Sequence, residues 1–463
     1  MILFRNINSK NKINFAKNHM HINKVYNIQN KGRKMKVSII TLGCKVNQYE
    51  SESIGNELIK NNIDVCFDLE NADAFIINTC AVTNEAERKS RGIITKIRKI
   101  NKTAPIFVCG CSSQHNPQKF AEHENVLAVY GTSSKLELVP KIIDFFKTKK
   151  GEQEIDTNIS CTYQEIPEAH GARTRTVIKI QDGCNNFCSY CLIPYVRGRE
   201  RSRSFESVKK EVEKQSKYSR EITFTGINLS AYGSDFEPKM SLKDIALLMK
   251  NYPSVRFKFS SLEQNIITED FVKTLSEIKN FAPHFHLSLQ NGCNKTLKAM
   301  NRKYSAEEFY DKIKIIRKYF PLGAITTDII VGFPTETEED AKENYTFVKN
   351  CQFAKMHIFP YSSRSGTAAS HMKNVATNVK QRAEELAKLD AKMHADYVKK
   401  CKNHIFELII ERKKDGSEYY EGHTENYIKC YVKSDKELAP NTLLKVKIEK
   451  PFEDGALAKI ASY

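Results

Sequence analysis

Short apolar runs alternate with amphipathic stretches from Val37 onward. The runs 37–42, 74–77 and 106–108 are typical of buried strands, and the stretches 50–60, 84–100 and 135–146 have the spacing of helices that are apolar on one face. Such alternation favours a parallel sheet that is covered by helices. We therefore predict an α/β fold in which residues 35–147 form an N-terminal domain with an open parallel sheet.

A polar stretch, residues 148–172, is predicted to be a linker, and a second alternating region follows it. Ser305 with Glu308, and Thr335 with Glu338, have the spacing of capping boxes, which mark helix starts. Six strand–helix units are fewer than the eight of a closed barrel, so residues 173–400 are predicted to form a partial (βα)6 barrel with a connecting helix from residue 378. The six expected strands are 176–180, 221–225, 255–260, 284–289, 325–331 and 354–359.

Beyond residue 401 the pattern changes to short strands, at 404–411, 427–432, 443–448 and 457–460, with turn sequences between them. It indicates a small antiparallel β-barrel over residues 401–463, a shape often used to bind RNA. Tyr427 and Lys429 lie where aromatic and basic residues interleave, which suits base stacking beside phosphate contacts. Tyrosine is equally a strand former, so a purely structural strand stays open.

Charge and hydropathy narrow the classes of function. Lys and Arg outnumber Asp and Glu by 73 to 55, and the formal net charge of +18 favours a polyanionic partner such as nucleic acid or, less often, an anionic membrane surface. No apolar run is long enough to cross a bilayer, so we expect a cytoplasmic protein with no membrane partner. Residues 1–34 are basic without any acidic residue, and we expect a disordered extension there.

Three cysteines, Cys184, Cys188 and Cys191, follow the first strand of the second region with the spacing CxxxCxxC. Cytosolic thiols stay reduced, so metal ligation is a better explanation for clustered cysteines than disulfides. Closed iron–sulfur and structural zinc sites take four ligands, whereas this stretch supplies three. The triad therefore predicts a metal centre with one position open to a small molecule.

Another three cysteines, Cys44, Cys80 and Cys111, each follow directly after a strand of the N-terminal domain. Because the carboxyl ends of parallel strands line one crevice, these thiols are expected to converge. Cysteine is also common near buried strands, so the pattern alone leaves a second metal site and plain packing both open. Cys109 competes with Cys111 but is expected to point into the packed surroundings of its strand.

Polar or glycine-containing loops follow several barrel strands, on the rim where barrel enzymes place their chemistry. An arginine-rich run beyond the cysteine triad offers contacts to RNA phosphates, although a plain solvated face is the alternative. The candidate cofactor-binding residues are Thr225, Gly226, Ser260, Glu263, Gln290, Val331 and Gly332, and the candidate RNA-binding residues are Arg197, Arg199, Arg201, Arg203, Tyr427 and Lys429.

The triad has an aromatic residue before its last cysteine and is followed by Leu192-Ile193-Pro194-Tyr195-Val196-Arg197-Gly198-Arg199; in this it resembles the radical S-adenosylmethionine (SAM) methylthiotransferases. The resemblance extends from about Met35 to the C-terminus. Residues 41–52, 181–184 and 420–427 look most like the branch that acts on threonylcarbamoyladenosine in tRNA. Thr335 departs from the family, which usually has a glycine there, and so does Cys293, where serine is expected.

The resemblance implies two 4Fe-4S clusters, of which Cys184, Cys188 and Cys191 would hold the one that binds SAM, and Cys44, Cys80 and Cys111 an auxiliary one. In the family a 5′-deoxyadenosyl radical removes hydrogen from carbon 2 of the adenosine, the auxiliary cluster supplies sulfur, and a second SAM supplies the methyl group. No catalytic residue is assigned beyond the clusters. The resemblance also implies a TRAM-like RNA-binding barrel at residues 401–463, and as partners a tRNA anticodon stem-loop, an external electron donor and a sulfur donor; we expect a monomer.

The predicted reaction is methylthiolation of carbon 2 of N6-threonylcarbamoyladenosine at position 37 of tRNA, giving the 2-methylthio derivative. Methylthiolation of isopentenyladenosine in tRNA, or of a ribosomal protein side chain, is the alternative among enzymes. A non-catalytic iron–sulfur or zinc RNA-binding protein is the alternative from another class, and it leaves the missing fourth ligand unexplained.

Overall fold

The computed structural model describes residues 34–167 and 175–462. These residues form two compact units. The first consists of 34–167 with Gly183–Asn185 and Cys191–Arg199, and the second of the remaining residues from 175 onward. The predicted disordered extension lies, apart from Lys34, outside the described residues, and so does the end of the predicted linker.

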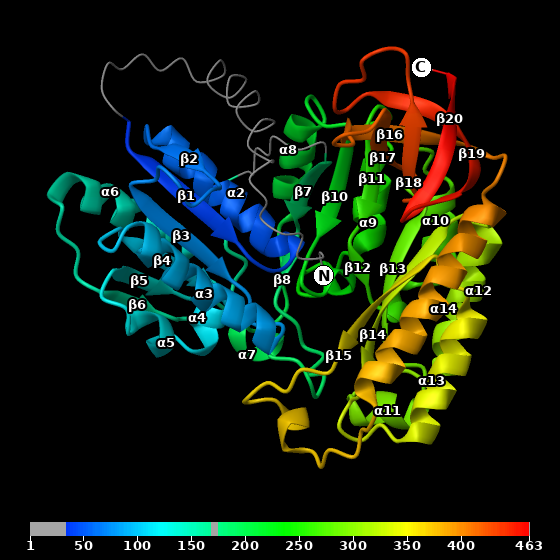
Figure 1. The fold of residues 1–463 in the computed structure, drawn as a ribbon, viewed down its shortest axis with the longest axis horizontal. Helices are drawn as coiled ribbons and strands as arrows, with labels where there is room; N and C mark the ends of the chain where they lie inside the picture. The colour runs from blue at the N-terminus through cyan, green and yellow to red at the C-terminus, as the bar shows by residue number, and fades with distance from the viewer. Residues whose placement is uncertain (1–33, 168–174, 463) are drawn as a thin grey trace. The chain divides into compact units, whose positions relative to one another are not determined.

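The first unit is built on a six-stranded, all-parallel sheet in the order β2-β1-β3-β4-β5-β6 (Figure 1). Its strands are β1 (Lys36–Thr41), β2 (Asp64–Cys66), β3 (Ala74–Thr79), β4 (Ile106–Gly110), β5 (Val126–Tyr130) and β6 (Glu154–Asp156). Alternate strand residues pack against helices on opposite faces: Ile39 lies in a core with α2 (Lys45–Lys60) and α6 (Leu138–Thr148), and Ile77 in one with α3 (Asn84–Ile100) and α5 (Gln118–Ala121). The predicted open parallel sheet is confirmed.

The second unit contains a partial barrel of parallel strands in two sheets, β11-β10-β7 and β12-β13-β14-β15. The third predicted strand is interrupted at Ser260, and its two halves, β11 (Arg256–Phe259) and β12 (Ser261–Leu262), belong to different sheets. The other strands are β7 (Arg175–Lys179), β10 (Glu221–Thr225), β13 (His284–Gln290), β14 (Ala324–Val331) and β15 (Lys355–Pro360). Six strand positions, open rather than closed, agree with the predicted partial barrel.

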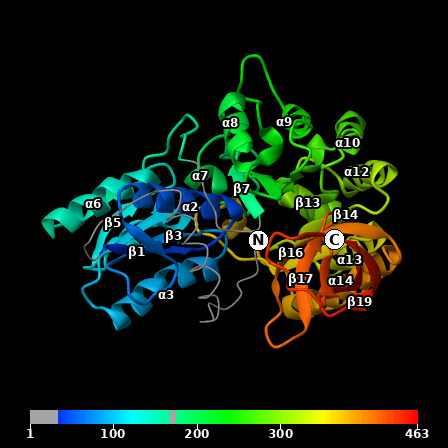
Figure 2. The same cartoon turned by 90° about the horizontal axis from the view of Figure 1, so that it is seen from above.

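Helices cover the outer side of these strands and share one large apolar core with them (Figure 2). The helices are α8 (Phe205–Gln215), α9 (Leu242–Met249), α10 (Glu269–Ser276), α11 (Asn294–Ala299), α12 (Ala306–Tyr319), α13 (Glu338–Cys351) and α14 (Val379–Lys400). The predicted capping box of Ser305 and Glu308 starts α12, as expected. The one predicted at Thr335 is wrong.

The start of α13 lies later than predicted because residues 333–336 form a turn instead. The Glu336 N–H donates to the Phe333 carbonyl at 2.8 Å, and the Glu336 carboxylate accepts from the Gly332 N–H at 2.6 Å. Thr337 then caps the helix, in a capping box with Asp340. Thr335 is not among the residues with positive φ, so the backbone tolerates a threonine where the family usually has glycine.

Residues from 405 onward form a closed barrel in the order β16-β17-β18-β20-β19. Its strands are β16 (Ile405–Lys413), β17 (Tyr419–Thr424), β18 (Lys429–Lys433), β19 (Leu443–Phe452) and β20 (Gly455–Ser462). A purely antiparallel barrel was expected. The structure has antiparallel pairings except between β18 and β20, which are parallel. β17 was not among the predicted strands. In the described part of the chain, no helix is long and apolar enough to cross a membrane.

Candidate active site

The cysteines of the first unit lie where the strands of its sheet end. Cys44 stands at the N-cap of α2 after β1, Cys80 follows β3, and Cys111 begins α4 (Cys111–His115) after β4. Burial, with smaller contributions from the neighbouring thiols of Cys111 and Cys44, raises the pKa of Cys80 to about 12. The three predicted thiols therefore converge. Such buried thiols ionise when a metal takes up the negative charge, which is the behaviour of metal ligands.

Cys109 is buried within the apolar core that β4 shares with α2 and α6. Burial also raises the pKa of its thiol to about 12. The prediction that Cys109 points into packed surroundings is confirmed. Cys111 lies in a different apolar cluster, together with Ala81 and Leu192. β4 ends at Gly110, which has a positive φ of 111°, and Cys111 begins α4, so its side chain does not continue the alternation of the strand.

Two asparagine amides hold together the loops that carry Cys44 and Cys80. The Asn47 Nδ2 donates to the carbonyl of Leu42 at 2.8 Å and to that of Thr79 at 2.9 Å. The Asn78 Nδ2 donates in turn to the Asn47 carbonyl at 2.9 Å. These bonds tie the end of β1 to the end of β3, and we call them the amide clamp.

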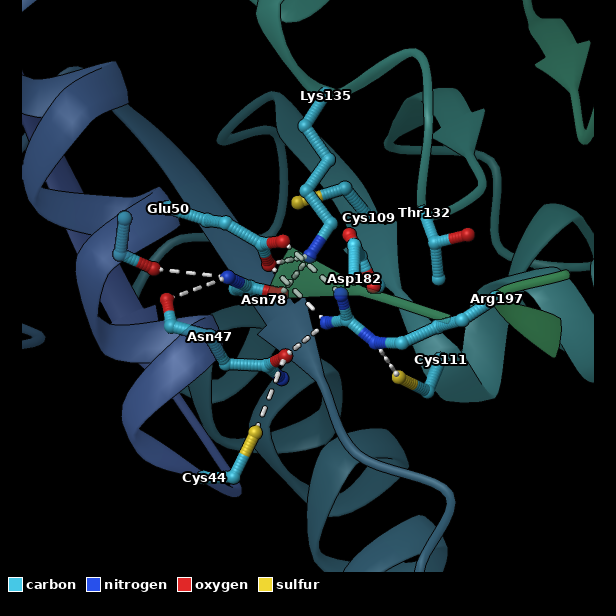
Figure 3. Close-up of polar contacts among 12 residues, drawn as sticks. Cys44, Asn47, Glu50, Asn78, Cys109, Cys111, Thr132, Lys135, Asp182 and Arg197 are labelled. Carbon is cyan, nitrogen blue, oxygen red and sulfur yellow. Dashed lines mark hydrogen bonds and ion pairs between the residues drawn. The ribbon is translucent and has the colours of Figure 1, made fainter. Parts of the chain in front are cut away.

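Arg197 is fully buried and lies at the centre of a charged network beside these cysteines (Figure 3). Its guanidinium donates to Glu50 at 3.0 Å and to the Asn47 Oδ1 at 2.7 Å, and its Nε lies 3.3 Å from the Cys111 sulfur. Lys135 forms a second ion pair with Glu50 and donates to the Asn78 Oδ1 at 3.3 Å. Burial raises the pKa of the Cys111 thiol, and the adjacent Arg197 guanidinium opposes this shift because it favours the thiolate.

Gly183 opens the loop of the second cysteine triad and has a positive φ of 72°. A Cβ added to it would overlap the carbonyl group of Arg199. The next residue, Cys184, donates its N–H to the Gly198 carbonyl at 3.1 Å, so the two stretches run close together. Only glycine meets both the positive φ and the close approach.

Gly183→Ala is therefore expected to destabilise the protein by more than the ~1 kcal/mol of unfavourable φ alone. Gly416→Ala is the matched control, because Gly416 has a similar φ of 67° with nothing within 4 Å of an added Cβ. Chemical denaturation measures both variants. If both variants lose the same unfolding free energy, the close contact between Gly183 and the Arg199 carbonyl does not contribute to the loss of stability.

Cys188 lies in the second unit, where its sulfur accepts a hydrogen bond from Arg302 Nη1 at 3.3 Å. Arg302 is buried, forms an ion pair with Glu263 and donates to the Ser288 carbonyl at 2.9 Å. The adjoining loop is fixed as well, since the Ser189 N–H donates to the Met300 carbonyl at 3.0 Å. A pocket here is lined by Asn186, Cys188, Asn228, Glu263, Gln264, Asn265, Asn301, Arg302, Lys303 and Tyr304.

The predicted cofactor-binding residues lie at the carboxyl ends of the barrel strands, as expected, but their surroundings differ. Glu263 shares the pocket of Cys188. Val331 has its side chain in the apolar core, which excludes a side-chain contact to SAM. Gly226 and Gly332 have packing reasons to be glycine, because an added Cβ would press on Gln181 or Val379. Thr225, Ser260 and Gln290 end or follow their strands, and a role for them stays a prediction.

The arginine-rich run does not form the exposed phosphate-binding surface that was predicted. Arg197 and Arg203 are buried and paired with Glu50 and Glu211, so both predictions are wrong. Arg201 is also buried, 3.8 Å from Asp182. Arg199 is exposed and stays a candidate. Three of the four arginines thus face acidic side chains rather than solvent: Arg197, Arg201 and Arg203.

Tyr427 is likewise wrong as a platform for RNA bases, because it packs against the partial barrel. Its hydroxyl donates to Glu221 at 2.7 Å, and its ring stacks on that of His284 at a centroid distance of 4.7 Å. The Lys258 ammonium lies over the same ring. Lys429 is partly buried and paired with Asp454 at 2.9 Å, so it offers at most a shared contact to phosphate.

Sequence reasoning did not single out four residues that the site uses: Asn47, Glu50, Lys135 and Arg302. Asn47 and Glu50 lie in the stretch after Cys44, at a helical spacing that turns both toward the same side of α2. Both lie within residues 41–52, a stretch that carries part of the resemblance to the family, and this was the one available signal. Lys135 and Arg302 come from distant parts of the chain, and nothing in their local sequence marks them.

Two family models match the two parts of the chain that carry the cysteine triads. The Radical SAM superfamily model matches residues 178–348, and the Uncharacterized protein family UPF0004 model matches residues 36–131. The threonylcarbamoyladenosine tRNA methylthiotransferase MtaB of Bacillus subtilis (strain 168) is 35% identical and covers 92% of this chain and 96% of its own length. A tRNA-2-methylthio-N(6)-dimethylallyladenosine synthase of Natranaerobius thermophilus is 32% identical, with 90% and 95% covered.

A solved structure shows the same fold. The radical S-adenosylmethionine methyltransferase TsrM of Kitasatospora setae has a TM-score of 0.51 at 14% identity, and the match covers 71% of this chain and 75% of that one. The radical SAM superfamily implies a 4Fe-4S cluster and SAM. With relatives above 30% identity over nearly the whole chain, this protein belongs to the radical SAM tRNA methylthiotransferase family and is an enzyme of that kind.

Proposed function

We propose that the enzyme methylthiolates carbon 2 of N6-threonylcarbamoyladenosine at position 37 of tRNA, using two SAM molecules and sulfur from an auxiliary 4Fe-4S cluster. The observation that carries the proposal is the convergence of Cys44, Cys80 and Cys111 at one end of the first sheet. A second three-thiol set is the donor chemistry that an iron–sulfur cluster needs, and an electron-transfer role alone would call for four.

Cys184, Cys188 and Cys191 are proposed to hold the cluster that binds SAM. When bound, this cluster supplies the electron that cleaves SAM. The Arg302 guanidinium donates to the Cys188 sulfur and would stabilise its thiolate, and the Glu263 carboxylate keeps Arg302 in that position. The pocket that these residues line gives SAM a polar wall.

The charged network around Arg197 is proposed to serve the auxiliary cluster in the same way. Its Nε contacts Cys111, while Glu50 and Asn47 hold the other guanidinium nitrogens. Cys80 and Cys111 are buried, which excludes water from these two thiols, whereas Cys44 is partly exposed. The protein thus orients the ligands and screens their charge, and leaves the bond-making chemistry to the clusters and SAM.

The substrate assignment is supported by the relative of Bacillus subtilis, whose name specifies threonylcarbamoyladenosine. The relative of Natranaerobius thermophilus, named for dimethylallyladenosine, is only slightly less similar, so isopentenyl-type adenosine is the second candidate. A ribosomal protein side chain has less support, because both relatives act on tRNA according to their names.

Nucleoside analysis of tRNA tests the substrate. Cells that lack the protein are expected to lose 2-methylthio-N6-threonylcarbamoyladenosine and to accumulate the unmodified threonylcarbamoyladenosine. Re-expression of the wild-type chain should restore the methylthio group, and re-expression of Cys80→Ala should not. If the isopentenyladenosine derivative disappears instead, the second candidate is correct; an unchanged profile contradicts both.

A further inference from the structure

Three potential metal ligands that include no cysteine face one another on adjacent strands of the partial barrel. They are His286 on β13, Asp328 on β14 and His357 on β15, and their ligand atoms all lie within 4.8 Å of one another. The strand register explains the grouping, since Thr326 is paired with His286, and Asp328 with His357. Side chains of neighbouring parallel strands at these positions lie on the same face.

The environment of His286 leaves one of its nitrogens available. The side chain is buried, with the residue only 8% exposed, and its Nδ1 lies 2.9 Å from the Thr326 hydroxyl. Its Nε2 makes no hydrogen bond, although it lies 3.4 Å from Asp328 Oδ2. Asp328 Oδ1 is also buried without a hydrogen-bond partner. Buried polar atoms normally have partners, so two such atoms side by side indicate a ligand between them.

A chain of hydrogen bonds fixes how this group is oriented. The Lys258 ammonium can only donate, and it lies 3.0 Å from His284 Nδ1, which puts the His284 proton on Nε2. That nitrogen lies 3.1 Å from the Thr326 hydroxyl, which also contacts His286 Nδ1. Imidazole ligands of metals characteristically have their second nitrogen held in this way by a hydrogen-bonding partner.

We propose that His286, Asp328 and His357 bind a divalent transition-metal ion, separate from the iron–sulfur clusters. Two imidazoles and one carboxylate are the ligand set of open zinc sites and of non-haem iron(II) sites, which keep further positions for water or a substrate group.

Zinc is the probe for this site, used on the holoenzyme with both clusters reconstituted. After incubation with zinc and desalting, the wild-type protein is expected to retain about one zinc atom per chain in addition to its iron. Zinc K-edge X-ray absorption should show nitrogen and oxygen neighbours only, near the ~2.0–2.1 Å typical of histidine ligands. Sulfur neighbours at about 2.3 Å would place the zinc on cysteines and overturn the proposal.

Single-residue variants distinguish the loss of a zinc ligand from a loss of folding. His286→Ala and His357→Ala should each lose the zinc while their iron content stays at the wild-type level, which shows that the chain is folded. Thr326→Val removes only the hydroxyl and is expected to weaken zinc binding about 10-fold. His404→Ala is the control, since His404 is exposed on the C-terminal barrel, and it should bind zinc like the wild type. Retention of zinc by both ligand variants, or no zinc in the wild type, contradicts the site.

Discussion

Cys80→Ala is expected to lower the iron content of the anaerobically reconstituted protein from about eight to about four atoms per chain. Cys80 lies between the thiols of Cys111 and Cys44, so its loss removes a third of the ligands of one cluster and leaves the other triad intact. Cys188→Ala should lose the iron of the SAM-binding triad instead and retain that of the auxiliary triad. Iron analysis together with electron paramagnetic resonance of the reduced protein distinguishes the two remaining clusters.

Cys109→Ala is the matched control for this experiment. Its thiol is as buried as that of Cys80 but lies in the apolar core on the other side of β4. It should keep about eight irons. If the wild type holds only about four irons and Cys80→Ala does not change that number, the auxiliary cluster does not exist.

Arg197→Met is expected to destabilise the protein by about 1–3 kcal/mol, the usual effect of leaving a buried hydrogen-bond acceptor unsatisfied. Glu50 would keep Lys135 as its cation, but the Asn47 Oδ1 would lose its donor, and the Cys111 sulfur would lose the adjacent positive charge. The same variant should therefore load less iron on the auxiliary triad. Chemical denaturation and iron analysis measure the two effects on one preparation.

Arg199→Ala is the control for charge, because Arg199 lies two residues away in the same run and is exposed. Its unfolding free energy should stay within about 0.5 kcal/mol of the wild type. Arg197→Lys tests geometry: it keeps the charge but cannot donate to Glu50, Asn47 and Cys111 together, so partial loss is expected. Wild-type stability in Arg197→Met would mean that the network is dispensable.

Most elements of the fold, and the places of Cys44, Cys80 and Cys111 directly after strands, could be read from the sequence because they depend on local pattern. The role of the six cysteines as cluster ligands comes from the resemblance to the family and stays a proposal. Strands with buried residues on both faces appear as short apolar runs, and a cysteine directly after such a run is bound to lie at the carboxyl edge of a parallel sheet. Cys44, Cys80 and Cys111 obey this rule without any knowledge of which strands are neighbours.

The partners of the charged residues could not be predicted in the same way. Arg197 stands in a run that has the composition of a solvated or phosphate-binding surface, and only the fold shows that Glu50, from far earlier in the chain, neutralises it. Tyr427 is a similar case, because its partner Glu221 belongs to another element altogether. The His286, Asp328 and His357 group depends on strand register, which the sequence does not state.

The amide clamp bears on how the auxiliary site is assembled. Because Asn47 and Asn78 already fix the loops after β1 and β3, the conformational entropy of ordering Cys44 and Cys80 is lost when the sheet folds, and not when iron binds. A ligand set ordered in advance binds more tightly and exchanges more slowly than one that must be gathered from mobile loops. The neutral asparagine amides achieve this without adding charge beside the thiols, so the sheet edge is preorganised for the auxiliary cluster that we propose.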